Sequence, residues 1–417
     1  MDQQPYELPD GWEWKSLKDI CDFENGDRGK NYPSRDAFVE KGIPVINAGN
    51  LNGWTVDSAG LNYINEERYN LIGGGKIKRG DILYCLRGSL GKCGIVDSID
   101  RGVIASSLVI VRPSNEIIKE LLLYYFNSSL SSHFVTHYNN GAAQPNLSAK
   151  SLSLFKIPLP PLSEQKRIVE KLDALISRID QAVNHLQESL GLAEALFASS
   201  LDGAFNPLGS RKNLEGIYEL PDGWEWKKLG EVIDFKNGYA FKSKVFSDQG
   251  IPVLRISNIQ NGSISDKNLT YYPENEVDDK ISQFFVEPGE IVIAMSGATT
   301  GKVAINDSKK RLLQNQRVGR LCIQNSTTRD YVYWYLSIKV EENLNKSLGA
   351  AQPNLSTSQI NNIDIPFPNL ALQSKIVIKI NTWFLKNKDL KKNLQSQIDD
   401  LIALKVSLLD SAFRGEL

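Results

Sequence analysis

Hydrophobic residues recur at alternating spacings of four and three along Leu162–Phe205, a stretch without proline. This period predicts one long amphipathic helix, whose apolar stripe would consist of Ile168, Leu172, Leu175, Ile179, Ala182, Leu186, Leu190, Ala193 and Leu196. Adding 208 to each number gives a second stripe, made of Ile376, Ile380, Trp383, Asn387, Leu390, Leu394, Ile398, Leu401 and Leu404. Because the two stripes match, we expect the helices to pack on each other as a coiled coil.

The rest of the chain is duplicated as well. ELPDGWEWK occurs at Glu7–Lys15 and again at Glu219–Lys227, and GAAQPNLS occurs at Gly141–Ser148 and Gly349–Ser356. A proline-rich hinge follows each octapeptide and leads into each long helix. A period of about 208 residues indicates a duplicated domain, because solenoid repeats run at roughly 20–50 residues.

Within each copy, short β-branched runs predict strands, and one helix is expected to close the domain, near Asn115–Ser128 and Thr328–Asn345. The expected strands are Ile43–Ile46, Ile82–Leu86, Val103–Val111, Ile251–Ile256, Ile291–Ala294 and Arg320–Ile323. We therefore expect an α+β fold with two tandem pseudo-symmetric recognition domains. They would occupy residues 1–160 and 219–368, with long helices at 161–205 and 369–417 and a linker at 206–218.

The linker constrains the direction of the two helices. Thirteen residues span at most about 45 Å when fully extended, whereas a helix of about forty residues is roughly 60 Å long. The linker cannot carry the chain back along the first helix to start a parallel second one. The helices should therefore run antiparallel, with one domain at each end and Leu417 near the N-terminus.

Composition narrows the class of protein. The chain has 417 residues, 41% hydrophobic and 23% charged, and a formal net charge of −1. The four cysteines form no CxxC pair, which indicates a reducing cytoplasm and argues against structural zinc. The sequence contains no apolar run of the roughly 18 residues that span a bilayer, and its polar N-terminus is not a secretory signal. Because nucleic-acid binders are usually basic, any such role needs local patches or a charged partner.

No catalytic motif is complete. GSLGK from Gly88 and GATTGK from Gly297 lack the spacing of a phosphate loop, so they indicate either glycine turns between strands or loops that meet DNA. His133 and His137 lack the glutamate of a zinc-protease helix and an evident third ligand. The compressed PD…ExK from Pro9 to Lys15 cannot arrange a nuclease site. Its tryptophans, like those at Trp224 and Trp226, favour packing at a domain edge.

The order LPDGWEWKKLGEV, GAAQPNLS and IPLPPLSEQKRIVEKLD resembles the specificity subunit of type I restriction–modification enzymes over nearly the whole chain. The resemblance implies a non-catalytic subunit whose two target-recognition domains each read half of a split double-stranded DNA sequence, while the helices set the gap. It implies two methyltransferase subunits, which carry S-adenosylmethionine and methylate adenine, and restriction subunits that use ATP and Mg. No cofactor is expected on this chain, which lacks the (D/N)PP(Y/F) tetrapeptide of adenine methyltransferases. The second hinge, FPNLALQSKIV, lacks the SEQ triplet, so partner docking could differ at the two ends.

Base reading calls for Arg or Lys toward guanine and Asn or Gln toward adenine. In the first copy the candidates are Asn47, Asn50, Arg87, Ser89 and Lys92. In the second copy they are Arg255, Asn258, Ser296, Thr299, Thr300, Lys302, Gln314, Asn315, Gln316 and Arg317. Any one of them could instead be a solvated loop residue.

The unchanged octapeptides supply Gln144, Asn146, Gln352 and Asn354 as candidates for the partner interface. We expect them in a cap and turn at the junction of domain and helix, and capping alone would explain them equally well. An alternative for the whole chain is a coiled-coil adaptor that does not bind DNA.

Overall fold

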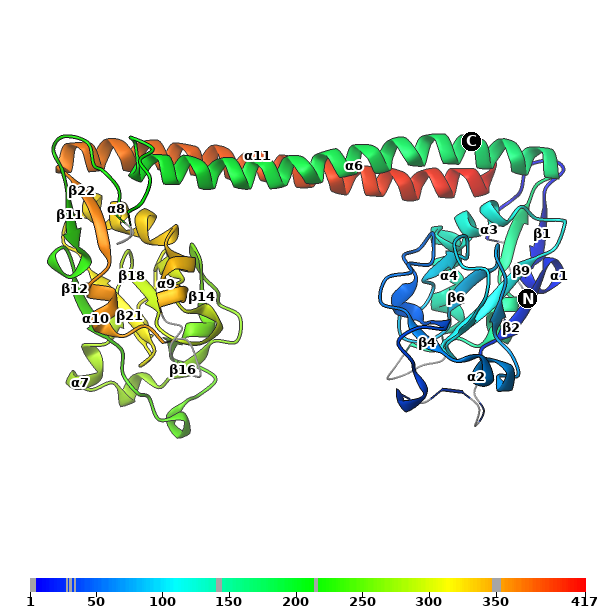
Figure 1. Ribbon diagram of the computed structural model, residues 1–417, viewed down its shortest axis with the longest axis horizontal. Coiled ribbons are helices and arrows are strands. Elements are labelled where there is room, and N and C mark those ends of the chain that lie inside the picture. Colours follow the sequence, from blue (N-terminus) through cyan, green and yellow to red (C-terminus); the bar gives the residue numbers. More distant parts are fainter. Residues whose placement is uncertain are drawn as a thin grey trace. The chain divides into compact units, whose positions relative to one another are not determined.

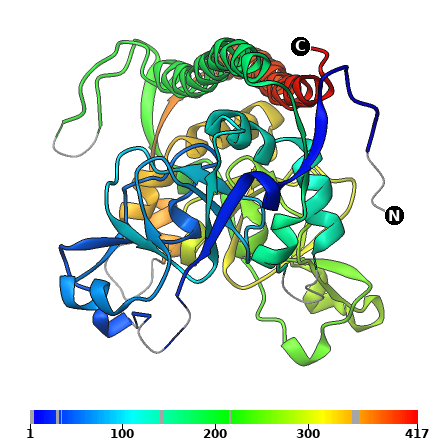
Figure 2. The same ribbon diagram turned by 90° about the vertical axis from the view of Figure 1, so that its right-hand side faces the viewer.

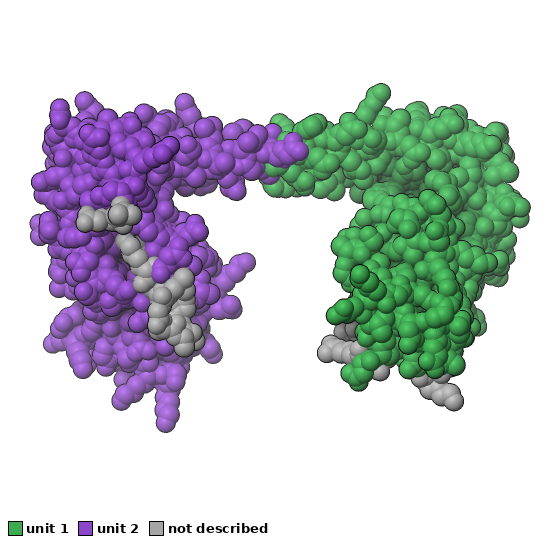
Figure 3. Space-filling model, viewed as in Figure 1, with its two compact units in different colours: residues 1–187, 395–417 green, residues 188–394 purple. Residues whose placement is uncertain are grey.

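The computed structural model describes residues 5–27, 29, 32–33, 35–139, 145–213, 217–346 and 354–417. The chain divides into two compact units, residues 1–187 with 395–417 and residues 188–394, which Figure 3 colours separately. These units do not coincide with the two sequence repeats. Each long helix begins in one unit and ends in the other, so each unit contains the last part of the other repeat's helix.

Unit 1 contains two four-stranded sheets, ordered β2-β9-β6-β7 and β4-β3-β8-β5, and the separate pair β1-β10. Pairing is antiparallel except between β3 and β8. Its strands are β1 (Glu13–Ser16), β2 (Cys21–Asn25), β3 (Ile43–Ile46), β4 (Asn62–Ile64), β5 (Lys76–Ile77), β6 (Ile82–Cys85), β7 (Cys93–Ile95), β8 (Gly102–Ile104), β9 (Leu108–Pro113) and β10 (Lys156–Leu159). Its short helices are α1 (Leu17–Ile20), α2 (Glu66–Leu71), α3 (Lys119–Phe126), α4 (Ser129–Tyr138) and α5 (Ala149–Ser153).

Unit 2 repeats this topology, with sheets β12-β21-β18-β19 and β16-β13-β20-β17, the pair β11-β22 and an added hairpin, β14-β15. Its strands are β11 (Trp224–Lys228), β12 (Asp234–Asn237), β13 (Ile251–Leu254), β14 (Ile259–Gln260), β15 (Ser263–Ile264), β16 (Thr270–Tyr272), β17 (Phe285–Val286), β18 (Ile291–Ala294), β19 (Val303–Ile305), β20 (Leu312–Gln314), β21 (Val318–Cys322) and β22 (Asp364–Pro368). Its short helices are α7 (Asp279–Ser282), α8 (Ser326–Ser337), α9 (Val340–Lys346) and α10 (Thr357–Asn361). The shared strand order confirms a duplicated α+β domain (Figure 1).

Two predicted elements are divided in the structure. The strand expected at Val103–Val111 is two strands, because a turn closed by Leu108 N–H donating to the Ala105 carbonyl at 2.9 Å sends β8 and β9 into different sheets. The helix expected near Asn115–Ser128 is α3, and the helix α4 that follows it was not expected. The Ser128 side chain caps α4, accepting from Ser131 N–H at 3.3 Å. The second copy shows the same break between α8 and α9.

The central strands of each unit are buried on both faces. In β6, Ile82 and Tyr84 pack into the cluster that includes the helices, whereas Leu83 and Cys85 pack into the cluster between the two sheets. In β18, Ile291 and Ile293 alternate with Val292 and Ala294 in the same way. Because successive side chains point to opposite faces, a continuous apolar run marks a strand that is covered on both sides.

The two long helices are α6 (Leu162–Phe205) and α11 (Leu370–Arg414). In unit 1 the Lys405 ammonium lies 2.8 Å from the Asp180 carboxylate, and Arg167 donates to the Leu417 carbonyl at 2.6 Å. In unit 2 the Asn387 side-chain amide donates to the Ala193 carbonyl at 2.7 Å. Also in unit 2, the rings of Phe197 and Phe384 lie 6.0 Å apart. Residue numbers therefore rise on α6 as they fall on α11 within each unit, which confirms the antiparallel direction. Among the described helices, none is both long and apolar enough to cross a membrane.

The predicted stripe is right along most of its length and wrong at three positions. Ile168, Leu172, Ile179 and Ile380 are buried, but Leu196, Leu390 and Leu404 are 69%, 47% and 47% exposed. On α6 the packed face continues from Ala193 through Phe197 to the buried Leu201, not through Leu196. A straight helix drifts against a strict seven-residue repeat, so spacing alone misplaces the seam near a helix end.

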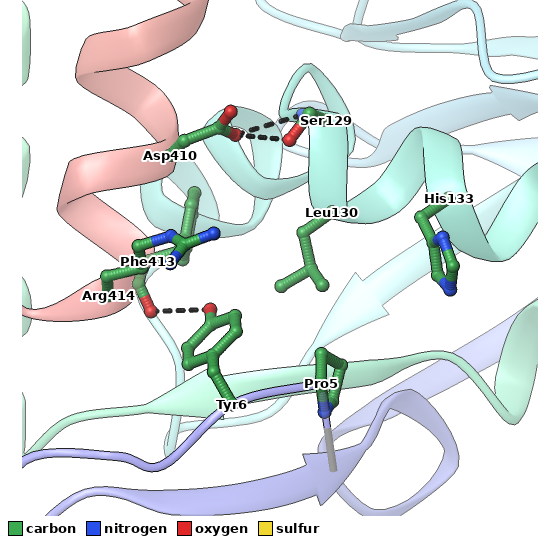
Figure 4. A pocket seen from close by; sticks show the side chains of 8 residues that line it. All are labelled: Pro5, Tyr6, Ser129, Leu130, His133, Asp410, Phe413 and Arg414. Carbon is green, nitrogen blue, oxygen red and sulfur yellow. Dashed lines mark hydrogen bonds between the residues drawn. The ribbon is translucent and has the colours of Figure 1, made fainter. Parts of the chain in front are cut away.

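The ends of the long helices complete the domain cores. Phe413 of α11 is 2% exposed in the helix-containing core of unit 1, and Phe205 of α6 is 1% exposed in that of unit 2. The hydroxyls of Tyr6 and Tyr218 donate to the carbonyls of Phe413 and Phe205, each at 2.7 Å. Figures 2 and 4 show the N-terminal segment beside the end of α11, which confirms that Leu417 lies near the N-terminus.

Replacing Phe413 by alanine should destabilise unit 1, although Phe413 belongs to the second repeat in sequence. Truncating a buried phenylalanine costs about 3–5 kcal/mol, so F413A should raise amide hydrogen exchange in β6 and β9, whereas F205A should raise it in β18 and β21. Hydrogen-exchange mass spectrometry of both variants tests this. Exchange that rises only in the repeat that carries the substitution would contradict the shared cores.

Candidate nucleic-acid interface

In unit 1 the GSLGK segment forms the turn between β6 and β7. Gly88 and Gly91 have φ angles of +77° and +81°, which favour glycine, and Lys92 N–H donates to the Ser89 carbonyl at 3.2 Å. Arg87 and Ser89 are exposed on the turn, and Lys92 is half-buried. The glycine turn predicted as one of two alternatives is therefore present, and it presents polar side chains to solvent.

The octapeptide lies directly beside this hairpin. Leu147 N–H donates to the Leu86 carbonyl at 2.9 Å, and Gly88 N–H donates to the Pro145 carbonyl at 3.3 Å. The Arg87 Nε–H donates to Asn146 Oδ1 at 3.2 Å. Arg87, Asn146 and Lys150 line one pocket of about 440 Å³. The structure thus brings a predicted DNA-reading residue and a predicted partner-interface residue together on one surface.

The place of the octapeptide differs from the expectation. The octapeptides do contain helix caps, but the capping residues are Ser148 and Ser356, whose side chains accept from Ser151 N–H and Gln359 N–H at 2.9 and 3.2 Å, and not Asn146 or Asn354. The position at a junction with the long helix is wrong, since a short helix and a strand separate each octapeptide from that helix. Gln144 and Gln352 lie outside the described residues.

Unit 2 has an equivalent surface beside the β18–β19 hairpin. Met295 N–H donates to the Arg317 carbonyl at 3.0 Å, and Leu355 N–H donates to the Met295 carbonyl at 2.7 Å. A bridge joins Ser296 to Asn354, as another joins Arg87 to Asn146 in unit 1. The turn of Asn315, Gln316 and Arg317, the end of β18 and the exposed Asn354 therefore adjoin, with Gln316 and Arg317 also exposed.

Five predicted reading residues are buried. Asn50 and Asn258 are 5% and 1% exposed, and their side chains hydrogen-bond to backbone within their own loops. Gln314 is 0% exposed and donates to the Lys236 and Val318 carbonyls, while Ser296 and Thr300 are 6% and 2% exposed. Side chains this deeply buried cannot contact a base directly in this conformation. The two asparagines instead hold the conformation of their own loops. Polar type alone does not distinguish a residue that folds its loop from one that faces outward.

The remaining candidates are at least partly accessible. Asn47 caps its own short turn, with its Oδ1 accepting from Gly49 N–H at 2.8 Å. Thr299 donates to the Ile256 carbonyl at 2.9 Å, and the Lys302 ammonium lies 3.3 Å from Gln260 Oε1. Arg255 donates through Nη2 to the Asn268 carbonyl at 2.8 Å. These contacts connect the loops around the hairpin of unit 2.

Three of the predicted reading residues of unit 2 have a buried polar atom without a partner, as do Tyr84 and Ser131 of unit 1 and Arg320. Among the described side chains, Arg255 Nε, Ser296 Oγ and Gln314 Oε1 are buried with no hydrogen-bond partner in the protein. A buried polar group left unsatisfied costs about 1–3 kcal/mol, so such atoms favour a site that water or a ligand completes.

The sequence reasoning missed residues that the internal repeat could have identified. Asn25-Gly26 and Asn237-Gly238 are the same dipeptide in both copies, and a Cβ at either glycine would lie 2.6 or 2.0 Å from the carbonyl oxygen of Ala105 or Asn315. The sequence reasoning also missed Ser106 and Ser107, which in unit 1 take the backbone positions that Gln316 and Arg317 take in unit 2. It missed Lys150 as well, which lines the pocket beside Arg87. The repeated Asn-Gly dipeptide could have predicted this close backbone contact, because only glycine, which has no Cβ, permits it.

A partly buried ion-pair network in unit 1 joins β2 and β9 to Asp81, the residue before β6. Arg112 donates to the Asp81 carboxylate at 2.9 Å and to Glu24, and Glu24 accepts from Gly75 N–H at 2.7 Å. Burial alone would raise the pKa of Glu24, but hydrogen bonds from Arg112 and from backbone N–H groups lower it overall. In unit 2, Arg320 pairs with Glu290 at 3.1 Å.

The sites considered for catalysis have other roles in the structure. Glu13 and Lys15 pair with each other at 3.1 Å on β1, and Trp12 and Trp14 pack against the core of unit 1. His133 lines a small pocket of about 180 Å³ with Tyr6 and Asp410 (Figure 4). Across the part of the chain that the structure describes, no cluster of three or more His, Cys, Asp or Glu residues could hold a metal ion. Burial raises the pKa of the Cys21 and Cys93 thiols to about 12.

Comparison with known proteins gives a consistent result. A family model described as a type I restriction modification DNA specificity domain matches the chain twice, at residues 9–190 and 221–400. The MjaVIII type I restriction enzyme specificity subunit of Methanocaldococcus jannaschii is 30% identical over 90% of this chain and 86% of that protein. The EcoKI specificity subunit of Escherichia coli is 23% identical over 98% of this chain and 90% of its own length.

Two solved structures share the fold. A chain from a study of complex assembly and conformational transition of the type I R-M system superposes with a TM-score of 0.79 at 22% identity, covering 99% of this chain and 100% of its own. The HsdS subunit from Thermoanaerobacter tengcongensis superposes with a TM-score of 0.56 at 21% identity, with 100% coverage of both chains.

Replacing Glu24 by glutamine should lower thermal stability at neutral pH but not in acid. Because the folded pKa of Glu24 is below its unfolded value of roughly 4.3, its contribution is present above that unfolded value and is lost as the pH falls through the folded pKa. The Tm deficit of E24Q should therefore be present at pH 7 and shrink toward pH 3. D22N, at an exposed position on the same strand, is the matched control. A deficit that does not change with pH would contradict the assigned ionisation.

Proposed function

Because the chain belongs to the type I restriction–modification DNA specificity family, we propose that it reads a bipartite DNA target, one half with each globular domain. Like the relatives described above, it is a specificity subunit and does not carry out catalysis. The observation that carries this proposal is the pair of equivalent surfaces. Their frames match, but Arg87 and Ser106 in unit 1 stand where unit 2 has Ser296 and Gln316. A shared frame with different side chains, of which Arg87 and Gln316 are exposed, supports two separate recognition tasks.

The chemistry of unit 1 centres on Arg87. Its Nε–H is held by Asn146, and a guanidinium oriented in this way can offer its terminal nitrogens as a fork to the O6 and N7 atoms of guanine. We therefore place Asn146, and Asn354 by equivalence, at the DNA surface instead of the partner interface. Lys92 and Lys150 are suited to phosphate contacts.

In unit 2 the exposed turn of Gln316 and Arg317 is the principal reader in this proposal. A glutamine side chain can pair with adenine at N6 and N7, and an arginine can pair with guanine. Arg255, Ser296 and Gln314 lie behind this turn with polar atoms that lack protein partners. Water or DNA can satisfy those atoms only if they become accessible on binding.

We propose modification and restriction subunits as the protein partners, with two copies of the methyltransferase. S-adenosylmethionine, ATP and Mg would be bound by those subunits. Since the net charge of this chain is −1, the partners would also supply much of the positive charge that attracts DNA. The methyltransferase would take the target adenine out of the stack. We also propose a cytoplasmic location, which the absence of a CxxC pair among the four cysteines favours.

The helix pair provides the spacing between the half-sites in this proposal. The chain passes from unit 1 to unit 2 along α6 and returns along α11. Two linked readers bind more tightly than either alone, because the second site binds at a high effective concentration. The half-sites would be separated by about one helical turn of DNA, roughly 34 Å.

Replacing Arg87 by alanine should relax recognition in one half-site only. A bidentate contact is worth about 1–3 kcal/mol of discrimination, which corresponds to roughly tenfold or more per base. R317A should relax the other half-site. The measurement is sequencing of methylated adenines in cells that express each variant with the modification subunit.

The control is R101A, because Arg101 is an exposed arginine that pairs with Glu66 and lies outside the hairpin surface. An unchanged methylated motif in both R87A and R317A would contradict the assignment of the readers. Affinity for duplex DNA should appear when the chain is mixed with the modification subunit and be absent without it. This result would distinguish the proposed function from that of a coiled-coil adaptor, which does not bind DNA.

Inserting four residues into each long helix should lengthen the gap between half-sites and leave both half-sites unchanged. The added residues extend a helix by about 6 Å, or nearly two base pairs. Suitable positions flank Leu186 and Leu394, where the spacing of the stripe is already irregular in both repeats. Methylome sequencing of the variant reports the gap directly. An unaltered gap in a methylating variant would contradict the spacing role.

A further inference from the structure

Unit 2 contains a largely apolar pocket between α6, α8 and the β14–β15 turn. Its volume is about 430 Å³, and it is formed by the end of α6, by α8, by the β14–β15 turn and by Phe384 of α11. Phe197, Trp334 and Phe384 form an aromatic cluster in its wall, with ring centroids 5.3–6.2 Å apart. Phe384 is 41% exposed.

The equivalent place in unit 1 is filled by the chain itself. The turn 53–54 stands between Leu51 and Val56, which form a bridge, as 261–262 stands between the paired Ile259 and Ile264. In both units an asparagine side chain ties this turn to the following helix, from Asn127 to the Gly53 carbonyl at 2.8 Å and from Asn261 to the Ser337 carbonyl at 3.1 Å. Gly53 and Gly262 both have a positive φ, of +101° and +94°, and their N–H groups donate to the carbonyls of Cys93 and Val303, the first residues of β7 and β19, at 3.0 and 2.9 Å. Trp54 therefore corresponds to Ser263, the residue after Gly262.

Trp54 shows what the open pocket accommodates. Its ring lies 5.4 Å from that of Tyr124, the equivalent of Trp334, and the Lys405 ammonium lies over it at 4.7 Å. Tyr124 and Trp334 correspond because they donate to Asp173 and Asn381, at matching positions of the two long helices. Unit 2 thus lacks the one aromatic side chain that closes this place in unit 1.

The surface around the pocket is also more apolar in unit 2 than at the equivalent place in unit 1. Where unit 1 has Lys405 paired with Asp180 at 2.8 Å, unit 2 has Phe197 in the aromatic cluster. On the same two helices Leu385, Leu196 and Leu192 are 59%, 69% and 71% exposed. An adjacent groove of about 170 Å³ also includes Phe197. An apolar surface of this kind, continuous with a pocket, marks a protein interaction site.

We propose that this pocket receives an aromatic side chain of the modification subunit, and that only unit 2 offers such an anchor. The inference rests on the proposed function, which supplies the partner. Buried aromatic side chains carry much of the energy of protein interfaces, and Asp202 at the rim can accept a hydrogen bond from an indole or phenol. Two modification subunits consequently bind this chain with unequal affinity.

The test fills the pocket with the side chain that unit 1 uses. Because Gly262 has a φ of +94°, the variant S263W places tryptophan after the positive-φ glycine, as in the Gly53-Trp54 turn. F384A is the second variant, which removes one wall of the aromatic cluster at a side chain that is 41% exposed. L71A, at an exposed leucine of unit 1 on the short helix α2, is the matched control.

Native mass spectrometry and titration with the purified modification subunit measure the two binding steps. We expect wild type and L71A to show two unequal steps, and both pocket variants to weaken one step by about tenfold or more while the other is unchanged. The methylated motif at saturating modification subunit should stay the same. Thermal unfolding confirms that each variant is folded, and F384A decides the outcome if S263W is not.

Three results would overturn the inference. One is that both steps in both folded variants equal those of wild type, and another is that wild type shows two equal steps. The third is that F384A abolishes a dimer of this chain alone, which would assign the pocket to a second copy. In contrast, a wild-type chain that binds no modification subunit at all would refute the proposed function itself.

Discussion

Each globular core depends on a phenylalanine contributed by the other repeat. Phe413 closes unit 1 and Phe205 closes unit 2, and in each case a tyrosine hydroxyl from the domain's first segment binds the same phenylalanine's carbonyl. A helix that ends inside a core cannot slide or reverse without exposing that core. The antiparallel direction of α6 and α11 is thus fixed by packing at both ends, and the polar contact of Asn387 with Ala193 adds a register between them.

A framework held in this way allows the exposed loops to differ without changing the fold. The octapeptide is bonded to the hairpin in both units, and the glycines at 26 and 238 bring two loops into close backbone contact. Only the side chains on this frame change, from Arg87 and Ser106 in one unit to Ser296 and Gln316 in the other. Recognition can therefore diverge between the two domains while the two domain cores and the helix pair remain alike.

The sequence predicted those features that depend on periodicity and duplication. The strands at Ile43–Ile46 and Ile291–Ala294, the two long helices and the place of Leu417 all agree with the structure. Residue spacing could not show where the buried face of each long helix departs from the seven-residue repeat. Leu196 and Leu404 were therefore assigned to the helix–helix contact although they are exposed. Residue type could not show that Asn50, Asn258 and Gln314 turn inward, because an amide that folds its loop looks the same in sequence as one that meets a base. The open pocket of unit 2 could not be predicted either, since it arises because Ser263 stands where unit 1 has Trp54.

Two dissimilar readers on one duplicated frame are the central claim, and the methylated motif of the wild-type chain tests it most directly. Single-molecule sequencing of modified adenines, in a host that expresses the chain with its modification subunit, reports that motif. The account predicts two different short half-sites separated by a fixed number of unspecified bases. A single uninterrupted motif, or two half-sites with a variable gap, would contradict it.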